Sequence, residues 1–139
     1  MKKLIYALLA FSLVTFVGCK KDDKQVEVNA ANVEGTWEYT GYFDGELNKW
    51  EPVEKGYSLK MIFKAGGIGS LVETDDEGSY DESFTYKVEN GRLKITDTDG
   101  YTESQQIKSL TKTELILISE EYTGDDGKKY QDTEHFKRK

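Results

Sequence analysis

The dipeptide Asn90-Gly91 places the strongest local constraint on this chain. A two-residue type I′ turn needs positive φ angles at both central positions, and Asn-Gly supplies them readily. The stretches on either side alternate apolar and polar residues, and a register centred on the turn sets Val88 against Leu93. The dipeptide therefore predicts an antiparallel hairpin between strands 79–89 and 92–96.

Similar alternating stretches follow one another along the chain, separated by turns rich in glycine and aspartate. No stretch keeps a 3.6-residue apolar period, and only 29–34 could form a helical turn. The predicted strands are 35–43, 57–65, 68–74, 79–89, 92–96, 101–109, 114–122 and 128–138. A second hairpin at Asp126-Gly127 would pair Leu117 with Phe136. Because every connection is short except 44–56, we expect an all-β, eight-stranded antiparallel up-and-down barrel.

The first and last predicted strands contain residues that resemble those of a known family. Gly35-Thr36-Trp37 opens the first strand, and Arg138 ends the last. A G-x-W at the head of the first strand, with a basic residue packing over the Trp, resembles the lipocalin superfamily. The resemblance implies that Gly35, Trp37 and Arg138 form the closed base of the barrel. The chain has no T-D-Y motif, disulfide or C-terminal helix, so it is more similar to short bacterial lipocalin-like lipoproteins than to the long carriers.

The N-terminal residues are predicted to form an export signal. Two lysines precede the apolar run 4–17, which is shorter than the ~20 residues a membrane-spanning helix needs. Phe16-Val17-Gly18-Cys19 resembles a bacterial lipobox, which implies cleavage between Gly18 and Cys19 and a lipid on the Cys19 thiol. Cys19 is the only cysteine, so the chain cannot form an internal disulfide.

These features predict the domain organisation and the location of the protein. Residues 1–18 would be the signal peptide, 19–28 a lipidated flexible tether and 29–139 the lipocalin-like barrel domain. We expect the mature protein in the cell envelope of a Gram-negative bacterium, anchored to a membrane by the lipid on Cys19. The acidic residues behind Cys19 resemble the surface-export tag of some outer-membrane lipoproteins, although a solvated spacer is the simpler interpretation.

The charge distribution restricts the partners. Removal of residues 1–18 takes away two lysines and no acid, so the net charge falls from −7 to −9. An acidic domain is unsuited to nucleic acid. In a meander, alternate connections lie at one end, and here those connections are acidic, whereas the other end is slightly basic. They include Asp76, Asp99 and Asp126, and they predict a mouth that attracts cationic ligands or basic partner surfaces.

No metal or cofactor is expected, because neither acidic turn completes a calcium-binding loop. An enzyme is also disfavoured: His135 is the only histidine, and we expect it on the outside of the last hairpin. Trp50, on the long first connection, and Tyr42 are candidates for the mouth, as a lid, a stacking surface or a plug. The expected core consists of Trp37, Tyr39, Leu59, Met61, Phe63, Phe84, Tyr86, Val88, Leu93, Ile95, Leu117 and Phe136.

Two functions remain open. The barrel mouth could bind a small molecule or a macromolecular partner, or the barrel could be filled and serve as an interaction module that docks a protein or glycan through its loops. An internal cavity of ~300 Å³ or more would favour the small-molecule binder, whereas continuous aromatic filling would favour the docking module.

Overall fold

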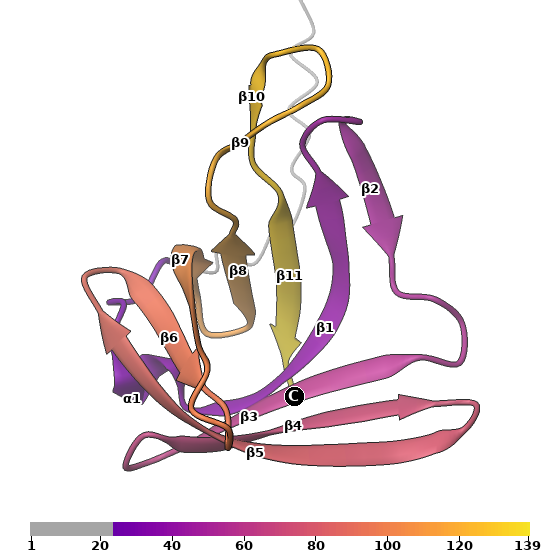
Figure 1. The fold of residues 1–139 in the computed structure, drawn as a ribbon. Coiled ribbons are helices and arrows are strands. Elements are labelled where there is room, and N and C mark those ends of the chain that lie inside the picture. Colours follow the sequence, from indigo (N-terminus) through magenta and orange to yellow (C-terminus); the bar gives the residue numbers. More distant parts are fainter. Residues whose placement is uncertain (1–23) are drawn as a thin grey trace, which may run out of the picture.

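The computed structural model describes residues 24–139; the predicted signal peptide, the cleavage site at Gly18 and Cys19 lie outside the described residues. One helical turn precedes a series of antiparallel strands (Figure 1). The elements are α1 (Ala30–Val33), β1 (Gly35–Asp44), β2 (Lys49–Pro52), β3 (Ser58–Lys64), β4 (Ile68–Asp75), β5 (Gly78–Glu89), β6 (Arg92–Thr96), β7 (Thr102–Leu110), β8 (Glu114–Ile118), β9 (Tyr122–Thr123), β10 (Lys129–Tyr130) and β11 (Thr133–Arg138). Within the described residues, no helix is long and apolar enough to cross a membrane.

The strands form a closed barrel. Neighbours pair in the order β1-β3-β4-β5-β6-β7-β8-β11, and β11 pairs with β1 to complete the ring. The eight-stranded, all-β, up-and-down barrel with a short helical turn before its first strand is therefore confirmed. Two additions extend from it: β2 pairs with the far half of β1, and β9 and β10 form a separate ribbon (Figure 1).

The β5–β6 hairpin has the register that the sequence predicts. Val88 lies opposite Leu93, and the turn residues Asn90 and Gly91 have φ angles of 52° and 74°. A two-residue turn with this geometry fixes the pairing of the strands that it joins, with no free residue to shift it. Lys87 and Lys94 lie opposite each other as expected, and Lys94 forms an ion pair with Glu89 at 3.0 Å.

The predicted register of the last hairpin is wrong by two residues. Phe136 lies opposite Leu115 instead of Leu117. The chain does turn near Asp126-Gly127, but three residues separate the hydrogen-bonded Gly124 and Lys128, where the prediction assumed two. Three residues, 119–121, separate β8 from β9, but only two, 131–132, separate β10 from β11. This difference shifts the register by one more residue. Because two residues restore the same face, Leu117 and Phe136 are still buried inside the barrel.

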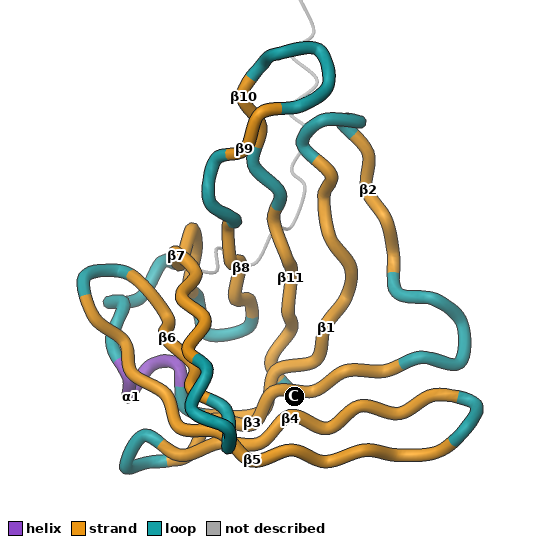
Figure 2. Tube along the Cα trace, viewed as in Figure 1, coloured by secondary structure: helices purple, strands orange, loops and turns teal. Residues whose placement is uncertain are grey.

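The long first connection is more ordered than the sequence suggested. Its residues Lys49–Pro52 form β2, which pairs with β1, so that Gly41 faces Pro52 (Figure 2). A side chain on Gly41 would lie 2.7 Å from the Trp50 ring, and Gly41 also has a φ angle of 137°. The missing side chain therefore allows Trp50 to lie across β1.

The base of the barrel is closed by the N-terminal segment. Trp37 is fully buried, and its Nε1 donates a hydrogen bond to the Val33 carbonyl at 2.7 Å. The Arg138 guanidinium lies 4.2 Å from the centroid of the Trp37 ring. Residues 25–28, which the sequence assigned to the flexible tether, pack here as well: the Val26 amide donates to the Leu110 carbonyl at 2.9 Å.

The core lies in the lower half of the barrel, near this base. Its buried residues are Val33, Trp37, Met61, Phe63, Phe84, Tyr86, Leu93, Ile107, Leu110, Leu115, Leu117 and Phe136. Of the expected core residues, Tyr39, Leu59, Val88 and Ile95 are only partly buried. The sequence missed Val33 and Leu110, which are the last residues of α1 and β7, and Leu115, which has the same parity as Leu117 on β8.

Candidate ligand-binding cavity

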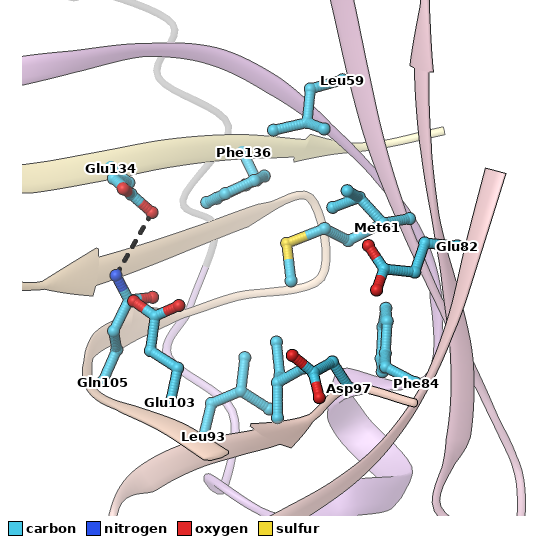
Figure 3. Close-up of a pocket in the computed structure, with 12 residues that line it drawn as sticks. Leu59, Met61, Glu82, Phe84, Leu93, Asp97, Glu103, Gln105, Glu134 and Phe136 are labelled. Atoms are coloured by element: carbon cyan, nitrogen blue, oxygen red, sulfur yellow. Dashed lines mark hydrogen bonds between the residues drawn. The ribbon is translucent and has the colours of Figure 1, made fainter. Parts of the chain in front are cut away.

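The upper half of the barrel encloses a cavity of about 280 Å³. Apolar side chains from β3 to β6 and from β11 form its floor and walls: Leu59, Met61, Leu71, Phe84, Leu93, Ile95 and Phe136 (Figure 3). All but Leu71 were predicted as core. They pack against the core below and bound an open volume above, so the barrel is not filled throughout.

Carboxylates and one amide line the rest of the cavity. Glu82, Asp97, Glu103, Gln105 and Glu134 project into it from β5, the β6–β7 turn, β7 and β11 (Figure 3). None of the residues within 24–139 that line it is a lysine, arginine or histidine. Among the described residues, neither Glu82, Glu103 nor Glu134 forms an ion pair. The cavity is thus apolar below and negatively charged above.

Glu134 is the carboxylate most withdrawn from water. Its side chain accepts one long hydrogen bond, from Gln105 Nε2 to Oε2 at 3.5 Å. Burial raises the pKa of Glu134, and the charge of Glu103 raises it further, whereas the bond from Gln105 acts in the opposite direction. An ionised Glu134 therefore lacks a strong partner in the described chain and is accessible to one from the cavity.

A second hollow borders the cavity on the side of β1 and the upper end of β11. This hollow of about 320 Å³ shares Gln105 and Glu134 with the cavity and is also lined by Tyr39 and Tyr42. The two tyrosines in turn border a third hollow of about 360 Å³. Burial raises the pKa of Tyr39, and the Glu134 charge adds to this. Both tyrosines therefore lie beside the carboxylate at the upper end of the cavity.

Comparison with known proteins identifies the fold family. A family model described as a lipocalin-like domain matches residues 33–117. The chain belongs to the lipocalin-like domain family. A lipocalin-like protein from Bacteroides uniformis has a similar structure, with a TM-score of 0.57, 15% identity and coverage of 78% of this chain and 99% of its own.

An uncharacterized protein from Bacteroides eggerthii has a similar structure as well, with a TM-score of 0.56, 13% identity and coverage of 76% of this chain and 98% of its own. No curated protein matches the chain. At these identities the structural likeness shows the fold alone. Lipocalin-like folds typically bind or transport ligands and are not typically catalytic.

The lipocalin-like domain places Gly35, Trp37 and Arg138 together at its base. A side chain on Gly35 would lie 2.5 Å from Arg138 Nη1. Arg138 also donates hydrogen bonds to the carbonyls of Lys112 at 2.7 Å, Asn32 at 2.8 Å and Glu34. These bonds connect the N-terminal turn, the β7–β8 connection and the end of β11.

Of the two aromatic residues predicted at the mouth of the lipocalin-like domain, one lines the hollows and the other lies outside them. Tyr42 lines the upper hollows, as described above, but Trp50 lines none of the hollows described here. The Trp50 ring contacts His135 edge to face, with the ring centroids 5.0 Å apart, and is 42% exposed. Since Glu134 faces inwards, its neighbour His135 faces outwards, so Trp50 packs on the outer wall and neither plugs nor covers the cavity.

Asp76, Asp99 and Asp126 are exposed and do not line the cavity. The connections that carry two of them do meet at one end: a side chain on Gly56 would touch Asp76, and the Asp125 amide donates to Glu46 at 3.1 Å. Asp126 instead binds Lys128 at 2.7 Å. Among the described residues, no group of three or more His, Cys, Asp or Glu side chains could hold a metal ion.

Sequence reasoning missed the interior carboxylates, although a signal for them was present. Glu82 has the same parity as Phe84 on β5, and Glu134 the same parity as Phe136 on β11. Period-two alternation, continued beyond the apolar positions, would have placed both carboxylates inside. The prediction did not extend the inward alternation to these positions, because it assumed that the interior of the barrel is apolar.

Proposed function

We propose that this is a lipid-anchored cell-envelope protein of a Gram-negative bacterium whose lipocalin-like barrel binds a small molecule. The observation that carries the proposal is the cavity of about 280 Å³ at the upper end of the barrel. Ligand sites typically combine apolar walls with a few convergent polar groups, and this cavity does so. We propose a binding function and not a catalytic one, because lipocalin-like folds typically bind or transport ligands.

The place where the described residues begin is compatible with anchoring through Cys19. Gln25 Oε1 accepts a hydrogen bond from the Leu110 amide at 3.1 Å, so the chain joins the barrel at its closed base. A lipid attached to Cys19 would then hold the base towards the membrane and direct the mouth away from it. This orientation would leave the cavity accessible to a ligand from the aqueous side.

Native mass spectrometry of the protein purified from its own cell envelope tests the binding function. A co-purified small-molecule mass that is released on unfolding is expected. Its absence, together with no binding from an envelope extract, would contradict the proposal. Anchoring is tested separately by fractionation, because Cys19→Ala should move the protein out of the membrane fraction while leaving the barrel intact.

The docking module remains the second candidate, and one observation favours it. Leu47 and Trp50 are 68% and 42% exposed on the β1–β2 hairpin, outside the cavity. A partner that binds there would be lost in a Leu47→Ser, Trp50→Ser variant, whereas a ligand in the cavity would be retained. The two functions can therefore be separated with one variant.

A further inference from the structure

We infer that the cavity, if it binds a small molecule as proposed above, selects an amphiphilic cation: an apolar chain on the Met61 and Phe136 floor and an ammonium group between Glu134 and the rings of Tyr39 and Tyr42. The inference specifies the ligand class of the proposed site. It rests on three features: the charge of the lining, the aromatic groups beside that charge, and the order in which the two occur along the barrel.

The charge of the lining favours a cation. Carboxylates line each of the three neighbouring hollows, and none of the described residues that line them is basic. Glu103 and Glu134 have no cationic partner among the described residues, in contrast with Glu51, which pairs with Lys49 at 2.6 Å. A fatty-acid carboxylate at this level would face like charges in a partly desolvated site, which is unfavourable.

The tyrosines supply a second contact for an ammonium group. Tyr42 lies directly opposite Glu134 across the β1–β11 pair, and Tyr39 lies opposite Phe136. All three side chains Tyr39, Tyr42 and Glu134 line the same hollow. A carboxylate beside aromatic faces is suited to an alkylammonium ion, because the rings attract its charge and contact its carbon atoms.

The order of these groups gives the ligand a direction. The strand register gives this order: from the base upwards, β1 and β11 pair Trp37 with Arg138, then Tyr39 with Phe136, then Tyr42 with Glu134. A linear amphiphile can satisfy both the apolar floor and the polar groups above it with its chain inwards and its charge outwards. A compact inorganic cation would leave the apolar floor without contacts, and the described residues form no metal-binding cluster.

The experiment compares three probes of equal chain length. Octyltrimethylammonium, octanol and octanoate are titrated, below their micelle concentrations, into residues 20–139 in a calorimeter. This chain contains all eight strands that pair to close the barrel, which lie between Gly35 and Arg138. We expect the cation to bind about tenfold more tightly than octanol, and octanoate to bind most weakly.

Two variants and a matched control locate the selectivity. Glu134→Gln keeps the shape of the side chain and should lower the affinity of the cation about tenfold while changing that of octanol less than twofold. Tyr42→Leu should also weaken the cation selectively. Glu77→Gln makes the same change in net charge on the exposed β4–β5 turn and should leave both affinities unchanged.

The outcomes separate the inference from the proposed function. Equal binding of octanol and the cation would overturn the inference and leave the small-molecule function standing. Equal effects of Glu134→Gln and Glu77→Gln would also overturn it, since overall charge would then explain the preference. If no probe binds but a small molecule co-purifies with the protein, the ligand class is wrong; if neither occurs, both proposals fail.

Discussion

Replacement of Arg138 tests whether the base of the barrel depends on one side chain. Its guanidinium donates to three backbone carbonyls, those of Lys112, Asn32 and Glu34, and lies over the Trp37 ring. A hydrogen bond contributes about 1 kcal/mol net, and an exposed cation–π contact contributes about 0.5–1 kcal/mol. Because the side chain is only partly buried, water can replace part of this, and we expect Arg138→Ala to lower the free energy of unfolding by about 3 kcal/mol.

Two further variants test which property of the Arg138 side chain accounts for this loss of stability. Arg138→Lys keeps the charge but loses the planar fork that reaches three carbonyls at once, so about half of the stability loss should remain. Lys137→Ala removes a neighbouring charge from the outer face of β11, where the residue is exposed. We expect the Lys137 variant to unfold within about 0.5 kcal/mol of the wild type.

Urea unfolding of residues 20–139, followed by far-ultraviolet circular dichroism, measures these differences. Amide hydrogen exchange adds a local readout, because loss of Arg138 should release protection first in the N-terminal segment that it holds. The reasoning would be refuted if Arg138→Ala and Lys137→Ala had the same small effect. It would also be refuted if Arg138→Lys retained full stability, since charge alone would then be sufficient.

Three more substitutions follow from the packing. Gly35→Ala should destabilise the barrel by about 2 kcal/mol or more, and more than Gly78→Ala, in urea unfolding; both glycines have positive φ, but only at Gly35 would a side chain meet the guanidinium. Leu115→Ala should reduce the free energy of unfolding by about 3 kcal/mol, and Leu59→Ala by less, because Leu115 is fully buried and Leu59 already borders an open cavity. Glu134→Gln should raise the free energy of unfolding at pH 7.5 but not at about pH 3.5. Burial raises the pKa of Glu134 in the folded protein above its value in the unfolded chain. The wild type therefore loses stability as the pH rises from the unfolded-state pKa to the folded-state pKa of Glu134.

The sequence predicted strand pairing correctly where a short turn alone determines the register of the two strands that it joins. Asn90-Gly91 leaves no residue between turn and strand, so the register of β5 and β6 follows from the turn. At the other hairpin, residues 119–121 and 131–132 lie between the ribbon and the barrel. Side chains bridge this break, among them Tyr122, whose hydroxyl donates to Asp132 at 2.9 Å. Contacts of this kind depend on the folded structure, and no pattern in the sequence indicates them.

Of the residues predicted at the mouth, Tyr42 lines the upper hollows, whereas the carboxylates that line the cavity were not predicted. The sequence indicated an acidic mouth with Asp76, Asp99 and Asp126, whereas the carboxylates at the cavity include Asp97 and Glu134. Turn aspartates are conspicuous but are satisfied by their own turns, as Asp126 is by Lys128. The position of Trp50 was equally inaccessible to the sequence, because it depends on a close approach to β1 that only the folded hairpin creates.

The interior carboxylates distinguish the two candidate functions further. Ionised groups that face a partly desolvated cavity without cationic partners oppose folding. A barrel that served only as a filled scaffold would be more stable with an apolar residue at Glu134, which shares the inner face with Phe136 and whose pKa is raised by burial. The lower half of the same barrel is filled in that way, around Trp37 and Phe63. The contrast between the two halves is therefore better explained by a ligand that neutralises the upper half than by the requirements of the fold.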